Sequence, residues 1–578
     1  MGDRLKILII PLLFGALFLQ FPLSHSLPEN NTTWYILSQF NFYYQKLFNL
    51  GFSGTSFFPV QNAVGLSDTG LIHFLIYLPF RIIFKNELWA YYFYLVSIFS
   101  LNFFVFNKFL KQVFKLEKSS VYGALVFSCS NFVFGNIGDP PVIFYPFFLL
   151  TFIYLDKYFH TKNYKHLIYA SLLCGLQVFS FSYVYFFLNI CVFLYFLLFR
   201  YKVKDAAFFF TINLLIGLLF FYPYINKFKN GEMVGLYNNK ANATIHSFME
   251  LKDFFKKVPG NIYGREGDLN NLYQLQIYAK ILESKNELHY LYPVVSSTQL
   301  GELVPPVNEN ILNEKVIYHQ LRKSGFVGFS VLLLSILGLL MFSRNKYKNF
   351  VNGLFLVGLF LCIGPYFQIG DDLWRTPLYF AYEHIPGFSF FRVPSRAFML
   401  CLISISVYSS VALSKIKYKG VFYLFIIVAL LENIPFPMKK WKYFSPPQNK
   451  ISKFLNTQDN KVLLYLPSDL GVYIFNDDKD VFAFQREYIY MNWKNYHSHS
   501  ILNGMAAYLP PSRIEIQKIL KNKNPFLSLK AIYNLDFVYF KESFFDKDFD
   551  NITLQDLIQN KNLSLKVQDD DSYLFKIN

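Results

Sequence analysis

The sequence carries little charge for its length. Of its 578 residues, 16% are charged, whereas globular chains average about 25%. The chain is instead 53% hydrophobic and 20% aromatic, with 70 Phe and 43 Tyr. This composition excludes a disordered chain and a collagen-like repeat, and it is not typical of an ordinary soluble enzyme.

Metal-binding and nucleophile motifs are also scarce. His497 and His499 have no evident third ligand, so they are interpreted as surface or turn residues. Zinc-protease, Gly-rich phosphate-loop and serine nucleophile-elbow spacings do not occur. The cysteines do not suggest a disulfide framework, because none lies in a long polar loop. All five lie within or at the edge of apolar runs: Cys129, Cys174, Cys191, Cys362 and Cys401.

Apolar runs long enough to cross a bilayer are abundant. About 20 apolar residues in a helix span the hydrocarbon core, and eleven such segments are predicted. The chain is therefore expected to be mainly α, a polytopic α-helical membrane protein. The predicted spans are the run that ends near residue 23 and the runs near 87–107, 119–135, 141–157, 165–181, 183–199, 206–224, 326–343, 349–366, 396–414 and 419–436.

Two apolar segments need separate interpretation. The first run ends at Ser24-His25-Ser26, which resembles a cleavage site, so it is either a signal peptide or a retained helix. The many later spans favour retention, and both alternatives place residue 30 outside the cytoplasm. Residues 71–84 are short and interrupted by Pro79 and Arg81, so an interfacial or re-entrant helix is expected there.

Basic residues concentrate in short loops between the spans. The 55 Lys and Arg against 38 Asp and Glu give a net charge of +17, and the positive-inside bias explains this excess better than nucleic-acid binding does. We expect an integral membrane protein with a cytoplasmic N-terminus. The loops assigned to the cytoplasm contain Lys108, Lys111, Lys115 and Lys118; Lys157, Lys162 and Lys165; Arg200, Lys202 and Lys204; Arg344, Lys346 and Lys348; and Lys415, Lys417 and Lys419.

The opposite side then receives the long polar segments. Outer loops are expected near 24–86, 225–325 and 367–395. The predicted domains are a transmembrane part, 1–436, and an extracytoplasmic α/β domain, 437–578. In the latter, residues 461–466, 537–540 and 573–577 have the pattern of strands, and 511–521 has that of a helix opened by proline and serine.

Three carboxylates on this side are candidates for chemistry. Glu29 and Asp68 are the only acids between His25 and Arg81. Glu29 follows the first span, where partial dehydration would raise the pKa of a carboxylate and suit it to act as a general base; the alternative is a solvated loop charge. Asp139 lies in Gly-Asp-Pro-Pro, either as a turn former or as a further acid.

The loop before the tenth span is rich in polar side chains, and Arg375 and His384 within it are candidates for substrate binding. Arg392 and Arg396 flank Pro394, which suits the first turn of the next helix. Guanidinium groups and backbone N–H donors at a helix start suit a phosphate or pyrophosphate. The alternative is a pair of arginines snorkelling at the interface, although arginine on the outer face runs against the positive-inside bias.

Several stretches, taken in order, resemble a group of bacterial membrane proteins related to the GT-C glycosyltransferases. The resemblance covers nearly the whole chain except the loop 225–325 and much of the tail, and the arginine-proline segment is its most specific part. The stretches are Pro28-Glu29-Asn30-Asn31-Thr32-Thr33-Trp34, Phe58-Pro59-Val60-Gln61-Asn62 to Leu66-Ser67-Asp68, Ile385-Pro386-Gly387-Phe388 with Phe391-Arg392-Val393-Pro394-Ser395-Arg396, and Asn503-Gly504 with Pro510-Pro511.

The resemblance implies a location in a bacterial inner or plasma membrane and an inverting transfer of a sugar from a polyprenyl-phosphate carrier to a glycan or lipid acceptor. It implies that Glu29 is the base and Asp68 a second candidate, with Arg392 and Arg396 holding the carrier phosphate. Relatives usually have Asp after Gly where this chain has Glu29 after Pro28, and the paired acidic motif of many GT-C enzymes is absent. A divalent metal is optional in the superfamily, and no ligand set in this sequence supports one.

Three functions are compatible with the pattern. The first is a membrane glycosyltransferase, and the second is a non-catalytic protein of the same fold that assists assembly or export of an envelope polysaccharide. A transporter or flippase is the third, and it is disfavoured because the predicted spans carry almost no charge at their centres. Membrane lipid, a lipid-linked sugar donor and an acceptor are the expected partners, and nucleic acid is not.

Overall fold

The computed structural model divides the chain into two compact units. The first comprises Met1–Ser24, Gly70–Tyr222 and Ile277–Lys440, and the second comprises His25–Thr69, Pro223–Gln276 and Trp441–Asn578. The predicted domains, 1–436 and 437–578, remain a prediction. The structure describes residues 3–28, 31–48, 56, 70–229, 234–235, 327–343, 345–369, 372–385, 388, 394–434, 438, 440–444, 450–468, 483–503, 508–509, 511–520, 522, 524–545 and 552–578.

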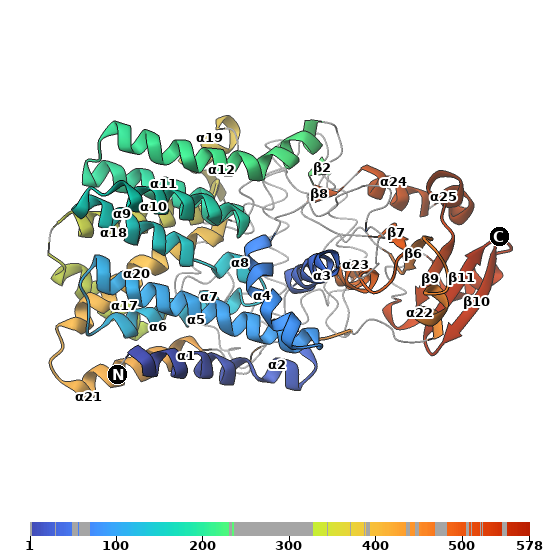
Figure 1. The fold of residues 1–578 in the computed structure, drawn as a ribbon, viewed down its shortest axis with the longest axis horizontal. Coiled ribbons are helices and arrows are strands. Elements are labelled where there is room, and N and C mark those ends of the chain that lie inside the picture. Colours follow the sequence, from blue (N-terminus) through green and yellow to red (C-terminus); the bar gives the residue numbers. More distant parts are fainter. Residues whose placement is uncertain are drawn as a thin grey trace. The chain divides into compact units, whose positions relative to one another are not determined.

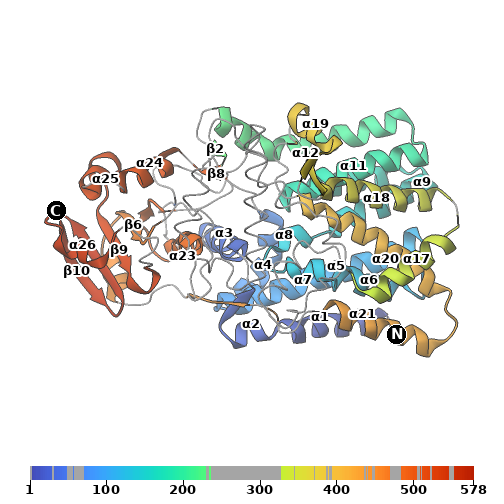
Figure 2. The ribbon, with the colours of Figure 1, turned by 180° about the vertical axis from the view of Figure 1, so that it is seen from behind.

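The first unit is built from helices that run alongside one another (Figures 1 and 2). Two short strands, β3 (Tyr366–Ile369) and β4 (Asp372–Arg375), form a hairpin within it. Its helices are α1 (Asp3–Phe18), α2 (Gln20–Leu23), α4 (Leu71–Ile83), α5 (Glu87–Val113), α6 (Ser120–Ser128), α7 (Asn131–Gly135), α8 (Pro140–Ile143), α9 (Pro146–Thr161), α10 (Tyr164–Leu176), η2 (Gln177–Phe179), α11 (Ser182–Phe199), α12 (Val203–Lys229, which continues beyond this unit), α17 (Phe329–Met341), α18 (Lys346–Ile363), α19 (Pro377–His384), η6 (Pro394–Ala397), α20 (Phe398–Ser414) and α21 (Lys419–Asn433).

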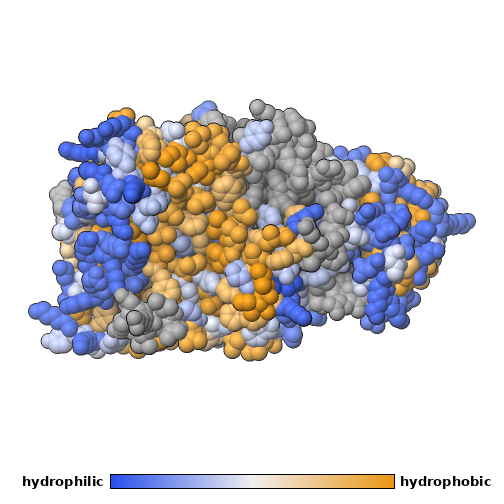
Figure 3. All heavy atoms as spheres, viewed as in Figure 1, coloured by the Kyte–Doolittle hydropathy of each residue, from blue (hydrophilic) through white to orange (hydrophobic). Residues whose placement is uncertain are grey.

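The prediction of an integral membrane protein is supported by the length and composition of these helices. Figure 3 shows a broad apolar band on this unit with hydrophilic residues gathered at one end. The prediction of eleven spans stays a prediction, since other expected spans form shorter apolar helices such as α17. Helix α4 corresponds to the segment that was expected to be interfacial or re-entrant. Within the described residues, six segments are long and apolar enough to cross a membrane: Glu87–Val113, Pro140–Thr161, Ser182–Phe199, Val203–Tyr222, Lys346–Ile363 and Pro394–Ser414.

Close packing of small residues places α20 at the centre of the first unit. In the most apolar window of Pro394–Ser414, 94% of the residues are buried. A Cβ atom on Gly338 of α17 would collide with the carbonyl of Tyr408, and one on Gly123 of α6 would collide with Ser410. Glycine at these positions therefore lets α17 and α6 approach the backbone of α20, as small residues do between membrane helices.

The second unit contains a five-stranded sheet in the order β10-β11-β9-β6-β7. Strand β6 is parallel to both β7 and β9, while β11 is antiparallel to β9 and β10. The predicted strands correspond to β6, β9 and β11, and the predicted helix corresponds to α24. The sheet strands are β6 (Val462–Leu466), β7 (Ser500–Ile501), β9 (Phe537–Lys541), β10 (Leu563–Asp569) and β11 (Ser572–Ile577).

Helices cover this sheet and bury an apolar core. Val462, Leu464, Val538 and Phe575 from the strands contact apolar residues of the helices in that core. The remaining elements of the unit are β1 (Ser26–Pro28), α3 (Asn31–Leu47), β2 (Val234–Gly235), β5 (Lys440–Lys442), α22 (Lys450–Leu455), α23 (Ala483–Lys494), β8 (Tyr508–Leu509), α24 (Pro511–Leu520), α25 (Pro525–Tyr533), η7 (Glu542–Phe544) and α26 (Leu554–Gln559).

Helix α3, which follows the first apolar run, packs on α23 within the second unit. Trp34 is fully buried and stacks on Tyr443, with ring centroids 5.4 Å apart and an interplanar angle of 7°. The backbone N–H of Tyr443 donates to the carbonyl of His25 over 2.9 Å. These contacts attach the segment on both sides of Glu29 to the C-terminal half of the unit.

Candidate functional site

Two of the predicted site residues meet in the first unit. Arg396 Nη2 donates to Asp139 Oδ2 over 2.8 Å, although 257 residues separate them along the chain. The Asp139 side chain is 3% exposed and that of Arg396 is 19% exposed. A carboxylate buried this deeply is stabilised by its cation, and the guanidinium has five N–H donors, of which this bond uses one.

Two aromatic rings lie against the guanidinium of Arg396. Its Cζ lies 4.9 Å from the ring centroid of Phe181 and 5.0 Å from that of Tyr183. The two rings stack on each other, with centroids 5.2 Å apart and an interplanar angle of 20°. Attraction between a cation and an aromatic face, worth about 0.5–2 kcal/mol depending on burial, restricts the guanidinium to one orientation.

Local sequence explains how these residues are presented. Asp139 is the N-terminal cap residue of α8, whose first two positions are Pro140 and Pro141. Proline has no N–H to satisfy and a fixed φ, so it suits the first turn of a helix. Arg396 lies in the 3-10 turn η6, which begins at Pro394 and runs into α20. Prolines therefore fix both helix starts, as the sequence predicts for Pro394.

The other described candidates lie elsewhere on the first unit. Arg375 is exposed on β4, and its Cζ lies 4.5 Å from the ring centroid of Tyr379. His384 is exposed in the last turn of α19. Their predicted part in substrate binding stays a prediction. Glu29, Asp68 and Arg392 lie outside the described residues, so their predicted roles remain proposals too.

Sequence reasoning missed the aromatic residues beside Arg396. Phe181 and Tyr183 fall where two predicted spans, 165–181 and 183–199, are separated by a single residue. The structure places a 3-10 turn and the start of α11 at this point. The sequence offered one indication of their role, which is that they flank a very short turn on the predicted outer side. Aromatic residues are so frequent in this chain that this indication does not distinguish them.

The histidines of the tail have structural partners. His497 Nδ1 accepts the backbone N–H of His499 over 3.2 Å, and its Nε2 lies 2.9 Å from the Tyr465 hydroxyl. His499 Nδ1 accepts from the backbone N–H of Lys461, and its Nε2 donates to the carbonyl of Leu455. Both residues are buried and so are not surface histidines, and they lie in the segment that connects α23 to β7, where a turn was the other expectation. Across the described part of the chain, no group of three His, Cys, Asp or Glu residues could hold a metal ion.

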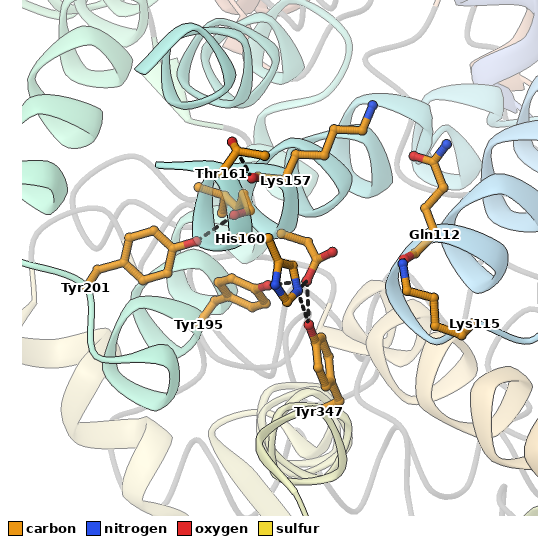
Figure 4. A network of polar contacts seen from close by, with 10 residues as sticks. Gln112, Lys115, Lys157, His160, Thr161, Tyr195, Tyr201 and Tyr347 are labelled. Atoms are coloured by element: carbon orange, nitrogen blue, oxygen red, sulfur yellow. Dashed lines mark hydrogen bonds and ion pairs between the residues drawn. The ribbon is translucent and has the colours of Figure 1, made fainter. Parts of the chain in front are cut away.

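A second polar cluster joins α9, α11 and α18. Asp156 is 5% exposed and accepts from the Tyr347 hydroxyl over 2.7 Å and from the Tyr195 hydroxyl over 3.5 Å. His160 Nε2 lies 3.0 Å from the Tyr347 hydroxyl, and Figure 4 shows His160, Tyr195 and Tyr347 turned toward one another. Lys157, which neighbours Asp156 in sequence, belongs to a loop expected in the cytoplasm, whereas the chemistry is expected on the outer side. We therefore interpret this cluster as a structural contact between the helices.

Comparison with known proteins identifies a fold but no sequence family. Neither a protein-family model nor a curated protein matches the chain. Among solved structures, it is similar to the arabinofuranosyltransferase AftD from mycobacteria, with a TM-score of 0.60 and 10% identity over 100% of this chain. A variant of AftD gives a TM-score of 0.55 at 9% identity, again over 100% of this chain.

This similarity concerns only part of the larger neighbour. The chain spans 40% of the length of AftD and 42% of that of the variant. At such low identity the likeness establishes the fold alone. It supports the resemblance to the GT-C group and identifies the protein as having a GT-C-like, membrane-helical fold.

Proposed function

We propose that the protein is a membrane glycosyltransferase, which transfers a sugar from a polyprenyl-phosphate carrier to an envelope glycan or lipid acceptor on the extracytoplasmic face. The observation that carries this proposal is the similarity of fold, over the whole chain, to a mycobacterial arabinofuranosyltransferase. The Asp139–Arg396 pair supports the proposal, because the pair supplies a fixed cation in the same unit as the candidate membrane spans.

Arg396 is suited to hold the phosphate of the carrier. The ion pair with Asp139 engages Nη2, and the planar guanidinium has further N–H groups in a fork that matches phosphate oxygens. Asp139 is accordingly a residue that orients Arg396, since its carboxylate oxygen accepts a hydrogen bond from the guanidinium. Arg392, four residues earlier in sequence, is the proposed second cation.

The transfer itself requires a base and a leaving group. In the proposed reaction, Glu29 or Asp68 removes the proton from the acceptor hydroxyl, whose oxygen attacks the anomeric carbon of the sugar. The bond from that carbon to the carrier phosphate oxygen breaks, and polyprenyl phosphate leaves with the electron pair. Arg396 stabilises the negative charge on that phosphate, as preorganised cations do in transfer reactions.

A second function is favoured by one feature of the sequence. The paired acidic motif of many GT-C enzymes is absent, and Glu29 stands where relatives usually have Asp. A non-catalytic protein of the same fold, assisting the assembly or export of an envelope polysaccharide, would not need these acids. Substitution of the acids therefore separates the two functions.

The test profiles lipid-linked intermediates by mass spectrometry in cells with and without the gene. The enzyme proposal predicts that cells without the gene accumulate an acceptor lacking one sugar. Complementation with Glu29→Gln or Asp68→Asn should leave that acceptor in place, whereas the control Glu117→Gln, at a side chain 73% exposed, should restore the wild-type profile. Full restoration by both Glu29→Gln and Asp68→Asn would contradict catalysis and favour the assembly function.

A further inference from the structure

A fully buried histidine is linked to both segments that hold the Asp139–Arg396 pair. His73, on α4, is 0% exposed. Its Nε2 lies 2.8 Å from the Ser180 hydroxyl, and its Nδ1 lies 2.8 Å from the Tyr94 hydroxyl. A neutral imidazole has one donor and one acceptor nitrogen, and a hydroxyl can play either part. The two hydroxyls therefore satisfy the neutral ring completely.

Ser180 connects His73 to the aromatic residues that cover Arg396. Ser180 is 1% exposed and immediately precedes Phe181 in the chain. Phe181 and Tyr183 lie 4.9 and 5.0 Å from the guanidinium carbon of Arg396. A hydrogen bond that fixes Ser180 therefore also limits where the Phe181 ring can lie. We call Phe181 and Tyr183 the aromatic platform.

The ring of His73 also contacts the segment that carries Asp139. The edge of Phe144 packs on His73 with ring centroids 5.0 Å apart and an interplanar angle of 73°. Phe144 caps the C-terminal end of α8, the short helix that Asp139 begins. One imidazole therefore joins both halves of the ion-pair site.

We propose that His73 is a positioning residue for Arg396. By bridging Tyr94 and Ser180, it fixes the aromatic platform and thereby the direction in which the guanidinium presents its remaining N–H groups. The identity of the anion rests on the proposed function, whereas the positioning of Arg396 does not. A histidine that merely fills the core would stabilise the fold without controlling the behaviour of this one arginine.

The reactivity of Arg396 toward phenylglyoxal tests the positioning directly. The full chain is purified in detergent, treated with phenylglyoxal and digested, and the modification rates of Arg396 and the exposed Arg375 are measured by peptide mass spectrometry. Ser180→Ala removes a single hydroxyl. It should raise the rate at Arg396 about 2- to 10-fold, corresponding to the loss of one buried hydrogen bond, and leave the rate at Arg375 unchanged.

Matched variants separate positioning from a general loss of stability. Tyr94→Phe and His73→Ala should also raise the rate at Arg396, and His73→Asn, which keeps an amide able to reach one hydroxyl, should restore part of the protection. His160→Asn is the control, because His160 is an exposed histidine of the Asp156 cluster. Where His73→Ala does not fold, Ser180→Ala decides the question.

A second measurement asks what the positioned arginine binds. A short-chain polyprenyl phosphate is added before modification, with inorganic phosphate as the headgroup-only probe. The concentration of polyprenyl phosphate that halves the modification of Arg396 should rise about 2- to 10-fold in Ser180→Ala, from the loss of one hydrogen bond. Protection by polyprenyl phosphate at concentrations where inorganic phosphate gives none would identify the lipid-linked source of the anion.

The outcomes of the two measurements are distinguishable. Wild-type modification rates at Arg396 in folded Ser180→Ala and His73→Asn would overturn the positioning role. Faster modification in these variants, with no protection of the wild-type arginine by polyprenyl phosphate, would support the positioning role and contradict the proposed donor role of Arg396. An equal rise at Arg375 would indicate general unfolding and would also overturn the inference.

Discussion

The side-chain amide of Asn41 donates a 2.8 Å hydrogen bond to Asn492 Oδ1, across 451 residues of sequence. Both residues are buried, and the bond joins α3 to α23 within the second unit. The Asn495 amide adds a second bond, to the carbonyl of Ser38, over 2.9 Å. The helix that follows the first apolar run is thus attached to the C-terminal part of the chain by specific polar contacts.

Removal of one partner should therefore destabilise the second unit. Asn492→Ala leaves the Asn41 amide buried without this acceptor, at a cost of about 1–3 kcal/mol in the free energy of unfolding. The measurement is denaturant unfolding followed by the fluorescence of Trp34 and Trp493, both buried in this unit. The double variant Asn41→Ala, Asn492→Ala should cost less than the sum of the single variants, and strict additivity would contradict a direct bond.

Acid should destabilise the same unit through His497. Burial, reinforced by the nearby His499 and Lys494, holds the pKa of His497 well below its usual value. In the unfolded chain the pKa is about 6.5, so below that pH the unfolded state binds the proton first and stability falls as pH falls. The expected slope is at most about 1.4 kcal/mol per pH unit for this residue.

The substitution His497→Gln tests this assignment. It removes the titrating group but retains an amide that can hydrogen-bond to the Tyr465 hydroxyl, which now lies 2.9 Å from His497 Nε2. The unfolding midpoint of the variant should vary less between pH 6.5 and pH 5 than that of the wild-type protein. An unchanged pH dependence would show that other groups cause the acid sensitivity.

Much of the helical architecture was predictable because hydrophobic runs and their boundaries are local properties. Span 87–107 corresponds to α5, and Pro394 begins a helical segment as expected, whereas Pro140 and Pro141, which were expected in a turn, begin the short helix α8. The break within 119–135 was not predictable from hydropathy. The structure ends α6 at Ser128 and starts α7 at Asn131, with the Ser130 hydroxyl accepting from the backbone N–H of Val133 over 3.3 Å.

The candidate site was predictable only in part, because it depends on contacts between residues that are far apart in the sequence. Residue type and position on the predicted outer side identified Asp139 and Arg396 separately, but sequence does not show that residues 257 positions apart form an ion pair. His73 was missed because its importance depends on Ser180, which is 107 residues away. Long-range contacts of this kind are made by the packing of helices, which one sequence does not encode in any short pattern.

The close approach of α17 to α20 predicts that an alanine substitution destabilises the protein at one glycine and not at another. Gly338→Ala should destabilise the first unit by about 1–3 kcal/mol, since the added methyl group meets the backbone of Tyr408 and must displace it. Gly420→Ala is the matched control, because nothing lies within 4 Å of its added Cβ. Thermal unfolding of the detergent-purified proteins provides the comparison, and equal midpoints for the two variants would contradict the packing of α17 on α20.

The predicted membrane orientation is testable by cysteine labelling. The five native cysteines are buried, so their background reaction with a membrane-impermeant maleimide should be low. In intact cells, Asn30→Cys and Lys566→Cys should be labelled and Lys417→Cys should be protected, because the lysine-rich loops are expected in the cytoplasm. Labelling of positions 30 and 566 from opposite sides of the membrane would contradict the proposed outer location of the reaction.

Arg396 provides the most direct test of the proposed donor site. Arg396→Lys retains a positive charge but loses the planar fork that pairs with Asp139 and lies on Phe181. Arg396→Gln removes the charge as well and leaves the Asp139 carboxylate buried without its cation, so this variant should be less stable than Arg396→Lys. Because Arg396→Gln also lacks the positive charge, we expect it to bind polyprenyl phosphate more weakly than Arg396→Lys does, even when both proteins fold.

The double variant Asp139→Asn, Arg396→Gln removes both charges and isolates binding from stability. Its unfolding midpoint should recover toward the wild-type value because no unpaired charge is left buried, whereas sugar transfer measured through the lipid-linked intermediates should stay low, because the phosphate has lost its guanidinium. Arg200→Gln changes an exposed arginine of a loop expected in the cytoplasm and is the charge-matched comparison. Recovery of transfer together with stability in the double variant would show that the ion pair only supports the fold, and the phosphate-binding role would then have to be sought outside the Asp139–Arg396 pair.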